Sequence, residues 1–320
     1  MTTVAVLPDG YIVRPPEPAD AAALFAMLAD CNSALIGSAD GTVTEVAEGI
    51  VEPGFDRRTD GFLVVGGGGR PVGYGTASGL GDRQVVDIQV WSRTPEVAAW
   101  LYGRTMDRAR EMGRENGHAE ITVETDVYRA DEPQRALLAG HSFTNGTTYH
   151  RMRIDHHEPV AMPAPPPGVV VRRGAWDDTS RWTAHELIIE CFQGQFGFVV
   201  RPHEEWIEYL ELLSTFDWSQ MTLLEVDGRA VALRKCTDAH LETDDCGYVG
   251  MLCVLEEFRG RGLARFLLQD AFAHDAAARR SGTMLDVDTN NPTPALGLYL
   301  AVGMEPVLVS EGWIRVVPVS

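Results

Sequence analysis

The chain has 320 residues, of which 45% are hydrophobic and 23% are charged, and its formal net charge is −19. This length suits two domains of about 150 residues each, and the composition indicates folded domains and not intrinsic disorder. The acidic balance argues against a nucleic-acid or anionic-membrane surface, since both need a broad basic face, and it favours cationic small substrates.

Five cysteines are scattered along the chain without a C-x-x-C pair. They predict neither a disulfide framework nor a zinc site, so we expect reduced thiols and no metal. The N-terminal residues lack a basic segment followed by an apolar one, and no uninterrupted apolar run approaches the ~20 residues of a membrane-spanning helix. We therefore expect a cytoplasmic chain, either a monomer or a homodimer, that binds neither membranes nor nucleic acid.

The predicted elements of the first half recur in the second half in the same order. Residues 11–28 predict a strand, a polar turn and a helix, residues 61–78 a hairpin with glycines at its tip, residues 85–113 a strand and a helix, and residues 121–143 a strand, a loop and a short helix. The same four patterns return at residues 169–187, 221–237, 247–282 and 284–304. An offset of 164 residues relates Val90 to Val254 and Val123 to Val287, which indicates duplication.

Four prolines between Pro163 and Pro167 favour extended chain and exclude helix, which indicates an interdomain linker. We predict an N-terminal domain at residues 1–155, a Pro-rich linker at 156–168 and a C-terminal domain at 169–320. The predicted fold class is α+β, with two tandem units that each contain a mixed, mostly antiparallel sheet flanked by helices.

The turn from Arg259 to Arg265 joins an apolar strand at residues 247–254 to an amphipathic helix that begins at Leu263. A helix N-terminus leaves its first N–H groups unpaired and carries partial positive charge, and Gly260 and Gly262 would let an anion approach the backbone. Arg259, Arg261 and Arg265 would add charge-assisted contacts. The turn therefore predicts a diphosphate site; the alternative is a tight loop with solvated arginines. The spacing matches neither a Rossmann nor a Walker motif.

Residues 259–264, RGRGLA, resemble the R/Q-x-x-G-x-G/A signature of the GNAT N-acetyltransferases. Residues 291–304 resemble the N-x-x-A-x-x-L-Y-x-x-x-G-F tail of the same family, with Asn291 one residue early and Met304 in place of Phe. The resemblance implies that the C-terminal domain binds acetyl-CoA as the acetyl donor. The implied cofactor-binding residues are Leu252, Cys253, Val254, Arg259, Gly260, Arg261, Gly262, Leu263, Ala264, Arg265 and Asn291.

The N-terminal half shares only the order of elements with that family. Pro95 stands where the phosphate-binding turn would open, and Ala136 stands where the tail would carry its Tyr. We therefore expect a degenerate GNAT-like domain that lacks the CoA pyrophosphate loop. The tandem pairing resembles mycothiol synthase and its relatives, but the substrate of that enzyme does not carry over to a chain with such a first half.

The resemblance implies that Tyr299 donates a proton to the CoA sulfur; the alternative is a core Tyr on a short helix. Cys253 in the middle of a strand is more typical of a buried hydrophobe than of a nucleophile. For the acceptor, residues 190–206 predict an apolar wall with an acid to meet a cation. The candidates are Glu190, Phe196 and Trp206, with Phe192, Phe198 and Glu204 as neighbours, and the candidates for a general base are Glu190, Glu242, Asp244, Asp245, Asp286 and Asp288.

These features together predict an N-acetyltransferase that moves an acetyl group from acetyl-CoA to a primary amine of a small molecule by direct transfer. Two alternatives stay open. One is a non-catalytic CoA-binding or interaction protein, which the degenerate first half favours. The other is an acetyltransferase that acts on a protein amine.

Overall fold

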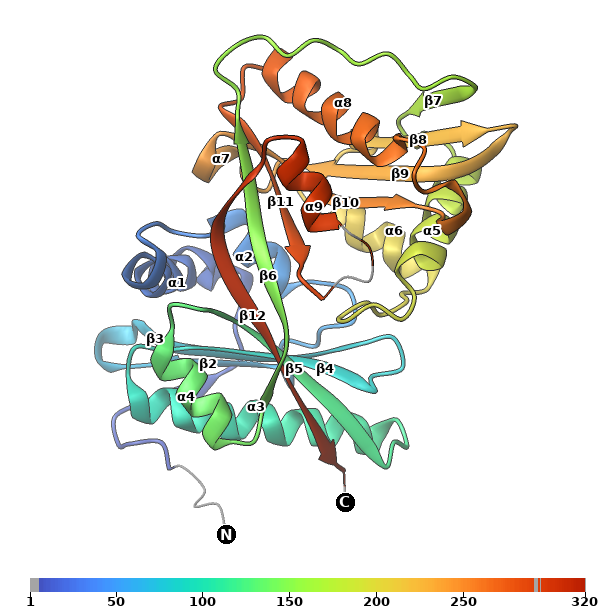
Figure 1. Cartoon of the computed structure of the whole chain (residues 1–320). Helices are drawn as coiled ribbons and strands as arrows, with labels where there is room; N and C mark the ends of the chain where they lie inside the picture. Colours follow the sequence, from blue (N-terminus) through green and yellow to red (C-terminus); the bar gives the residue numbers. More distant parts are fainter. Residues whose placement is uncertain (1–5, 291–292, 294, 320) are drawn as a thin grey trace. The chain divides into compact units, whose positions relative to one another are not determined.

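The computed structural model describes residues 6–290, 293 and 295–319, and it divides the chain into two compact units. The N-terminal unit comprises the residues up to Gly146 together with those from Ser310 onward, and the C-terminal unit comprises Thr147–Val309. The chain passes from one unit to the other twice, inside strand β6 (Thr144–Asp155) and inside strand β12 (Glu305–Pro318) (Figure 1).

The N-terminal unit has a sheet in the order β1-β2-β3-β4-β5-β12, in which only β4 and β5 are parallel. Its strands are β1 (Ile12–Arg14), β2 (Gly61–Val65), β3 (Pro71–Leu80), β4 (Val85–Trp91) and β5 (Glu120–Tyr128), and its helices are α1 (Ala21–Ile36), α2 (Val43–Ile50), α3 (Pro95–Glu115) and α4 (Glu132–Gly140).

The C-terminal unit repeats this plan with a sheet in the order β6-β11-β10-β9-β8-β7, in which only β10 and β11 are parallel. The predicted α+β class with mixed, mostly antiparallel sheets is confirmed. The strands are β7 (Val169–Arg173), β8 (Met221–Val226), β9 (Arg229–Thr237), β10 (Cys246–Val254) and β11 (Gly282–Asp288), and the helices are α5 (Asp178–Phe192), α6 (His203–Leu212), α7 (Leu241–Asp244), α8 (Leu263–Ala277) and α9 (Ala295–Ala301).

The last strand of each half completes the sheet of the other unit. Residues 310–318 of β12 pair antiparallel with β5, and residues 149–155 of β6 pair antiparallel with β11. The boundaries predicted at 155 and 169 therefore differ from those of the structure, which lie at Gly146 and Val309. An alternating strand pattern fits any sheet that buries one face, so the local sequence does not specify the partner strand.

One helical stretch in the described part of the chain, Pro18–Ile36, is long and apolar enough to cross a membrane by length and composition alone. Its Leu24 is fully buried and packs with Ile50 of α2 and Leu63 of β2. This part of the apolar surface of α1 thus contributes to the core of the N-terminal unit.

Alternation along β9 assigns its side chains to the two faces of the C-terminal sheet. Arg234 faces α8, where it donates to the Leu267 carbonyl oxygen at 3.0 Å and to Asp270 at 2.9 Å. Leu233 and Lys235 therefore face the opposite side, where Leu233 joins the core formed with Leu187 of α5. The sheet thus presents the apolar Leu233 on the face toward α5 and α6, and the charged Arg234 on the face toward α8.

Candidate active site

The sheet of the C-terminal unit opens between β10 and β11. The two strands pair in parallel only from Cys246 to Tyr248, whereas β10 continues along β9 as far as Val254. The register with β9 shifts between Val249 and Met251, which places a bulge at Gly250. Beyond Tyr248, β10 therefore has a strand partner on one edge only, and backbone groups on its other edge are available to a ligand.

The turn that follows β10 ends at the N-terminus of α8. Gly260 and Gly262 have φ angles of 75° and 79°, in the left-handed region that favours glycine. A Cβ at either position would meet no atom within 4 Å, so the backbone conformation and not crowding requires glycine here. The Phe266 N–H donates the first helical hydrogen bond, to the Gly262 carbonyl oxygen. The N–H groups of residues 263–265 therefore lie in the unpaired first turn.

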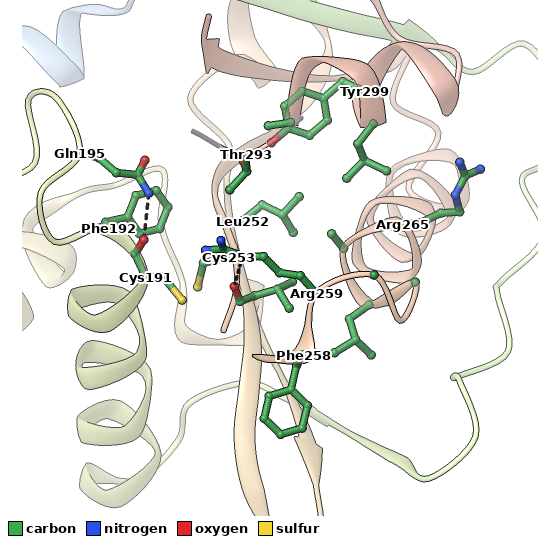
Figure 2. A pocket seen from close by; sticks show the side chains of 17 residues that line it. Cys191, Phe192, Gln195, Leu252, Cys253, Phe258, Arg259, Arg265, Thr293 and Tyr299 are labelled. Atoms are coloured by element: carbon green, nitrogen blue, oxygen red, sulfur yellow. Dashed lines mark hydrogen bonds between the residues drawn. The ribbon is translucent and has the colours of Figure 1, made fainter. Parts of the chain in front are cut away.

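These elements surround a cavity of about 300 Å³ in the C-terminal unit. Figure 2 shows side chains from α5, β10, the turn before α8, and α9 around it. The lining includes most residues that the sequence assigned to cofactor binding or catalysis. These are Leu252, Cys253, Val254, Arg259, Gly260, Gly262, Leu263, Ala264, Arg265 and Tyr299.

Two of the three predicted arginines line the cavity. Arg259 donates from Nε to the Val254 carbonyl oxygen at 3.2 Å, which holds its guanidinium at the end of β10 (Figure 2). Arg265 projects from the first turn of α8 and is exposed. Arg261 does not line the cavity; its guanidinium lies 4.7 Å from the centre of the Phe258 ring and donates to the Glu257 carbonyl oxygen. The local positive charge thus comes from Arg259, Arg265 and the helix N-terminus.

Tyr299 lies on α9 at the other end of the cavity. Its side chain is buried, and Figure 2 shows the hydroxyl directed into the cavity. Within the described part of the chain, this hydroxyl has no hydrogen-bond partner. Burial raises the pKa of Tyr299 to about 12. The phenol therefore keeps its proton throughout the physiological pH range and is able to donate a hydrogen bond.

Two thiols face the cavity, one from α5 and one from β10. The neighbouring Cys191 thiol, and then burial, raise the pKa of Cys253 well above its usual value. A thiol with a raised pKa is a poor nucleophile at neutral pH because the thiolate is the reactive form. Cys253 therefore acts as a small buried side chain of the wall, in agreement with its interpretation from sequence.

The residues predicted for acceptor binding do not come together at the cavity. Glu190 is exposed and lies 3.6 Å from Arg229. Trp206 is only 7% exposed and packs against Trp218 in the core, and Phe196 is a partly buried loop residue. Of that segment, Phe192 does line the cavity. Asn291 lies outside the described residues.

Some candidates for a general base already have partners. Asp286 accepts from the Tyr248 hydroxyl at 3.0 Å and pairs with Arg151, and Asp244 pairs with His240 at 3.0 Å. The cavity also has lining residues to which the sequence assigned no role. These are Cys191, Gln195, Phe258, Thr293, Ala295 and Leu298. The sequence of α5 carries no motif, and Phe258 lies before the glycine turn and outside its motif.

The chain resembles solved structures along almost its whole length. A GCN5-related N-acetyltransferase from Sphaerobacter thermophilus is 23% identical, with a TM-score of 0.80 and 98% of each chain covered. A tandem GNAT protein from the clavulanic acid biosynthesis pathway is 16% identical, with a TM-score of 0.70 and 97% of this chain and 99% of that chain covered. Saccharomyces cerevisiae N-myristoyltransferase with bound myristoyl-CoA is 12% identical, with a TM-score of 0.65 and 98% and 80% covered. At these identities the likeness shows the fold.

No curated protein matches the chain in sequence at a significant level. Residues 182–304 match the model of the acetyltransferase (GNAT) family. This range contains α5, β10, the glycine turn, α8 and α9, which are the elements that line the cavity. The C-terminal unit is therefore an acetyltransferase domain of the GNAT family.

Proposed function

We propose that the C-terminal unit transfers an acetyl group from acetyl-CoA to the amine of a small molecule. The observation that carries this proposal is one cavity lined both by the glycine turn at the start of α8 and by the Tyr299 side chain. An acyl transferase of this kind needs an anion site for the cofactor and a proton donor near the thioester, and the two lie at opposite ends of the same cavity.

The residues of the chain fit the diphosphate of CoA. The unpaired N–H groups of residues 263–265 and the guanidinium groups of Arg259 and Arg265 would hold it, while Gly260 and Gly262 maintain the turn. The edge of β10 without a strand partner, at residues 252–254, would exchange backbone hydrogen bonds with the pantetheine arm, apart from the Val254 carbonyl oxygen, which accepts from Arg259. A backbone N–H on this edge would also stabilise negative charge on the thioester oxygen.

Tyr299 would donate a hydrogen bond to the departing sulfur. With its pKa at about 12, complete transfer of the proton to a thiolate of pKa ~8.5 is uphill by roughly 3.5 units, or about 5 kcal/mol. A shared hydrogen bond that stabilises the thiolate therefore fits the burial of this side chain better than full protonation.

The N-terminal unit would bind no CoA. Its α3 begins directly at Pro95, with Thr94 at the N-cap, so the glycine turn of the C-terminal unit has no counterpart there. We accordingly propose one active site per chain. We also propose a cytoplasmic location for the enzyme.

Calorimetry with CoA and a thiol-release assay with acetyl-CoA and a panel of amines test the proposal. We expect CoA to bind with a stoichiometry of one and thiol release to depend on the added amine. CoA binding without turnover of any amine, including protein amino groups, would favour the non-catalytic alternative. The absence of CoA binding would overturn the assignment of the cavity.

A further inference from the structure

Lys235 is the only lysine in the chain, whereas arginine occurs at every other basic position apart from histidine. It lies in the middle of β9, opposite Met251 of β10 and Met221 of β8. Its side chain faces α5 and α6, the face opposite that of Arg234. Its side chain is only partly accessible, so Lys235 contributes less to the charged surface than a fully exposed lysine would.

The side chain of Lys235 extends across β10 to the point where that strand leaves β11. Its Cε lies 3.6 Å from the position that a Cβ on Gly250 would occupy, and the Tyr248 ring lies at a similar distance from the same point. Tyr248 is the last residue of β10 that pairs with β11, and Gly250 is at the bulge. The ammonium group is therefore next to the opening in the sheet. Met251, the residue of β10 opposite Lys235, is two residues from Cys253, which lines the cavity.

No carboxylate compensates the charge of Lys235 in the described part of the chain, where this side chain forms no ion pair and no hydrogen bond. The titratable groups that act on it are the Cys236 thiol, whose pKa burial raises, and Arg201, which is itself a cation. Burial above all, with a smaller effect from Arg201, lowers the pKa of Lys235 to about 8 although the side chain is partly accessible. Burial makes the charged form of this lysine unfavourable in free energy when it has no counter-ion, and a bound anion would offset that penalty.

The location of this charge decides which anion it suits. The diphosphate site lies at the other end of β10, beyond Val254, and Arg259 and Arg265 supply its charge. The acceptor amine would have to reach the thioester at the opening of the sheet, beside Gly250. A group that is attached to that amine at short range would meet the Lys235 ammonium. A single ammonium balances the single negative charge of a carboxylate, whereas a phosphate monoester carries about two charges.

We propose that Lys235 binds a carboxylate of the acetyl acceptor, so that the acceptor carries an amine and a carboxylate close together, as an amino acid does. This inference rests on the proposed function of the cavity. It also revises the expectation from net charge alone, since the acidic chain presents a positive group at this place. On acceptor binding, the ammonium gains a counter-ion and its proton is held more tightly.

Because the chain has one lysine, labelling with [6-¹³C]lysine gives a single side-chain Cε resonance. We expect this resonance to titrate near pH 8 in the CoA-bound protein. Saturating amino acid, drawn from the twenty protein amino acids, should raise that pKa by at least ~1 unit, and the matching amino acid amide should leave it unchanged. If no amino acid moves the titration, Lys235 does not bind a carboxylate and the proposal is wrong.

Kinetics with the same pairs of acids and amides give a second test. In the wild type we expect KM for the best amino acid to be ~10–100-fold below KM for its amide. Lys235→Met should abolish that difference by raising KM for the acid alone, and Lys235→Arg should retain much of it. If Lys235→Met instead lowers kcat equally for acids and amides, the side chain acts on the amine as a base, which overturns the proposal.

Calorimetry separates these outcomes from a failure of the proposed function. CoA should bind Lys235→Met as it binds the wild type, since the diphosphate residues are elsewhere. Loss of CoA binding in the wild type would refute the cavity assignment, whereas normal CoA binding without discrimination between acids and amides would refute only the role of Lys235.

Discussion

Replacing Gly262 by Asp and by Asn tests whether the start of α8 binds the diphosphate. The two side chains have nearly the same size and both tolerate a left-handed backbone better than other residues, so they share the strain of a φ of 79°. That strain costs about 1–2 kcal/mol of folding stability. They differ in charge, which is the property that matters for an anion site.

The magnitude follows from the geometry of the turn. No atom lies within 4 Å of a Cβ at Gly262, and the residue lines the cavity, so the new side chain would extend into the space assigned to the ligand. A carboxylate at ~5 Å from one phosphate charge, with an effective dielectric constant of ~20, opposes binding by about 3 kcal/mol. We therefore expect Gly262→Asp to bind CoA ~100-fold more weakly than Gly262→Asn, a variant that itself loses up to ~10-fold through its added volume.

Calorimetric titration with CoA at two salt concentrations measures this difference, and thermal unfolding checks that both variants fold. The gap between the two variants should narrow at high salt because the repulsion is screened. Folded Asp and Asn variants with equal CoA affinity would refute the assignment of the diphosphate to this turn.

The remaining predictions concern catalysis, stability and stoichiometry. Tyr299→Phe should lower kcat ~10–100-fold with little change in KM for acetyl-CoA, as measured by thiol release, because only the hydroxyl in the cavity is removed. Asp270→Asn should lower the free energy of unfolding by about 3 kcal/mol, since it leaves Arg234 buried without its partner at 2.9 Å. Burial would raise the pKa of Asp270, but Arg173 and Arg234 outweigh it and the pKa is lowered, so its contribution is present above pH ~4 and is lost in acid. Denaturant unfolding should accordingly show that the variant and the wild type converge at low pH. In the N-terminal unit, burial first and Asp126 second raise the pKa of Asp87 to about 7, so this carboxyl destabilises the fold increasingly as pH rises from ~4 to 7. Asp87→Asn should therefore raise Tm more at pH 8 than at pH 4, and an equal gain at both pH values would contradict this account. Finally, calorimetry should give one CoA per chain, and a value of two would show that the N-terminal unit binds it as well.

Local sequence was sufficient to predict the features that depend on a few consecutive residues. Glycine is the residue that most readily adopts the left-handed backbone seen at positions 260 and 262, and the apolar spacing that begins at Leu263 favours the helix that the structure has there. The repeated order of strands and helices was readable for the same reason, because each element is encoded within its own segment.

Tertiary structure decided what depends on partners far apart in sequence. The exchange of β6 and β12 between the units could not be predicted, because a strand pattern does not name the strand beside it. The aromatic residues of 190–206 look alike in sequence, yet Phe192 lines the cavity while Trp206 is buried against Trp218, since the direction of each side chain depends on how α5 and α6 pack. Lys235 is an ordinary strand residue in the sequence. Only the fold places its ammonium beside the bulge of β10, where it forms no ion pair with any carboxylate in the described part of the chain and where a bound anion would neutralise it.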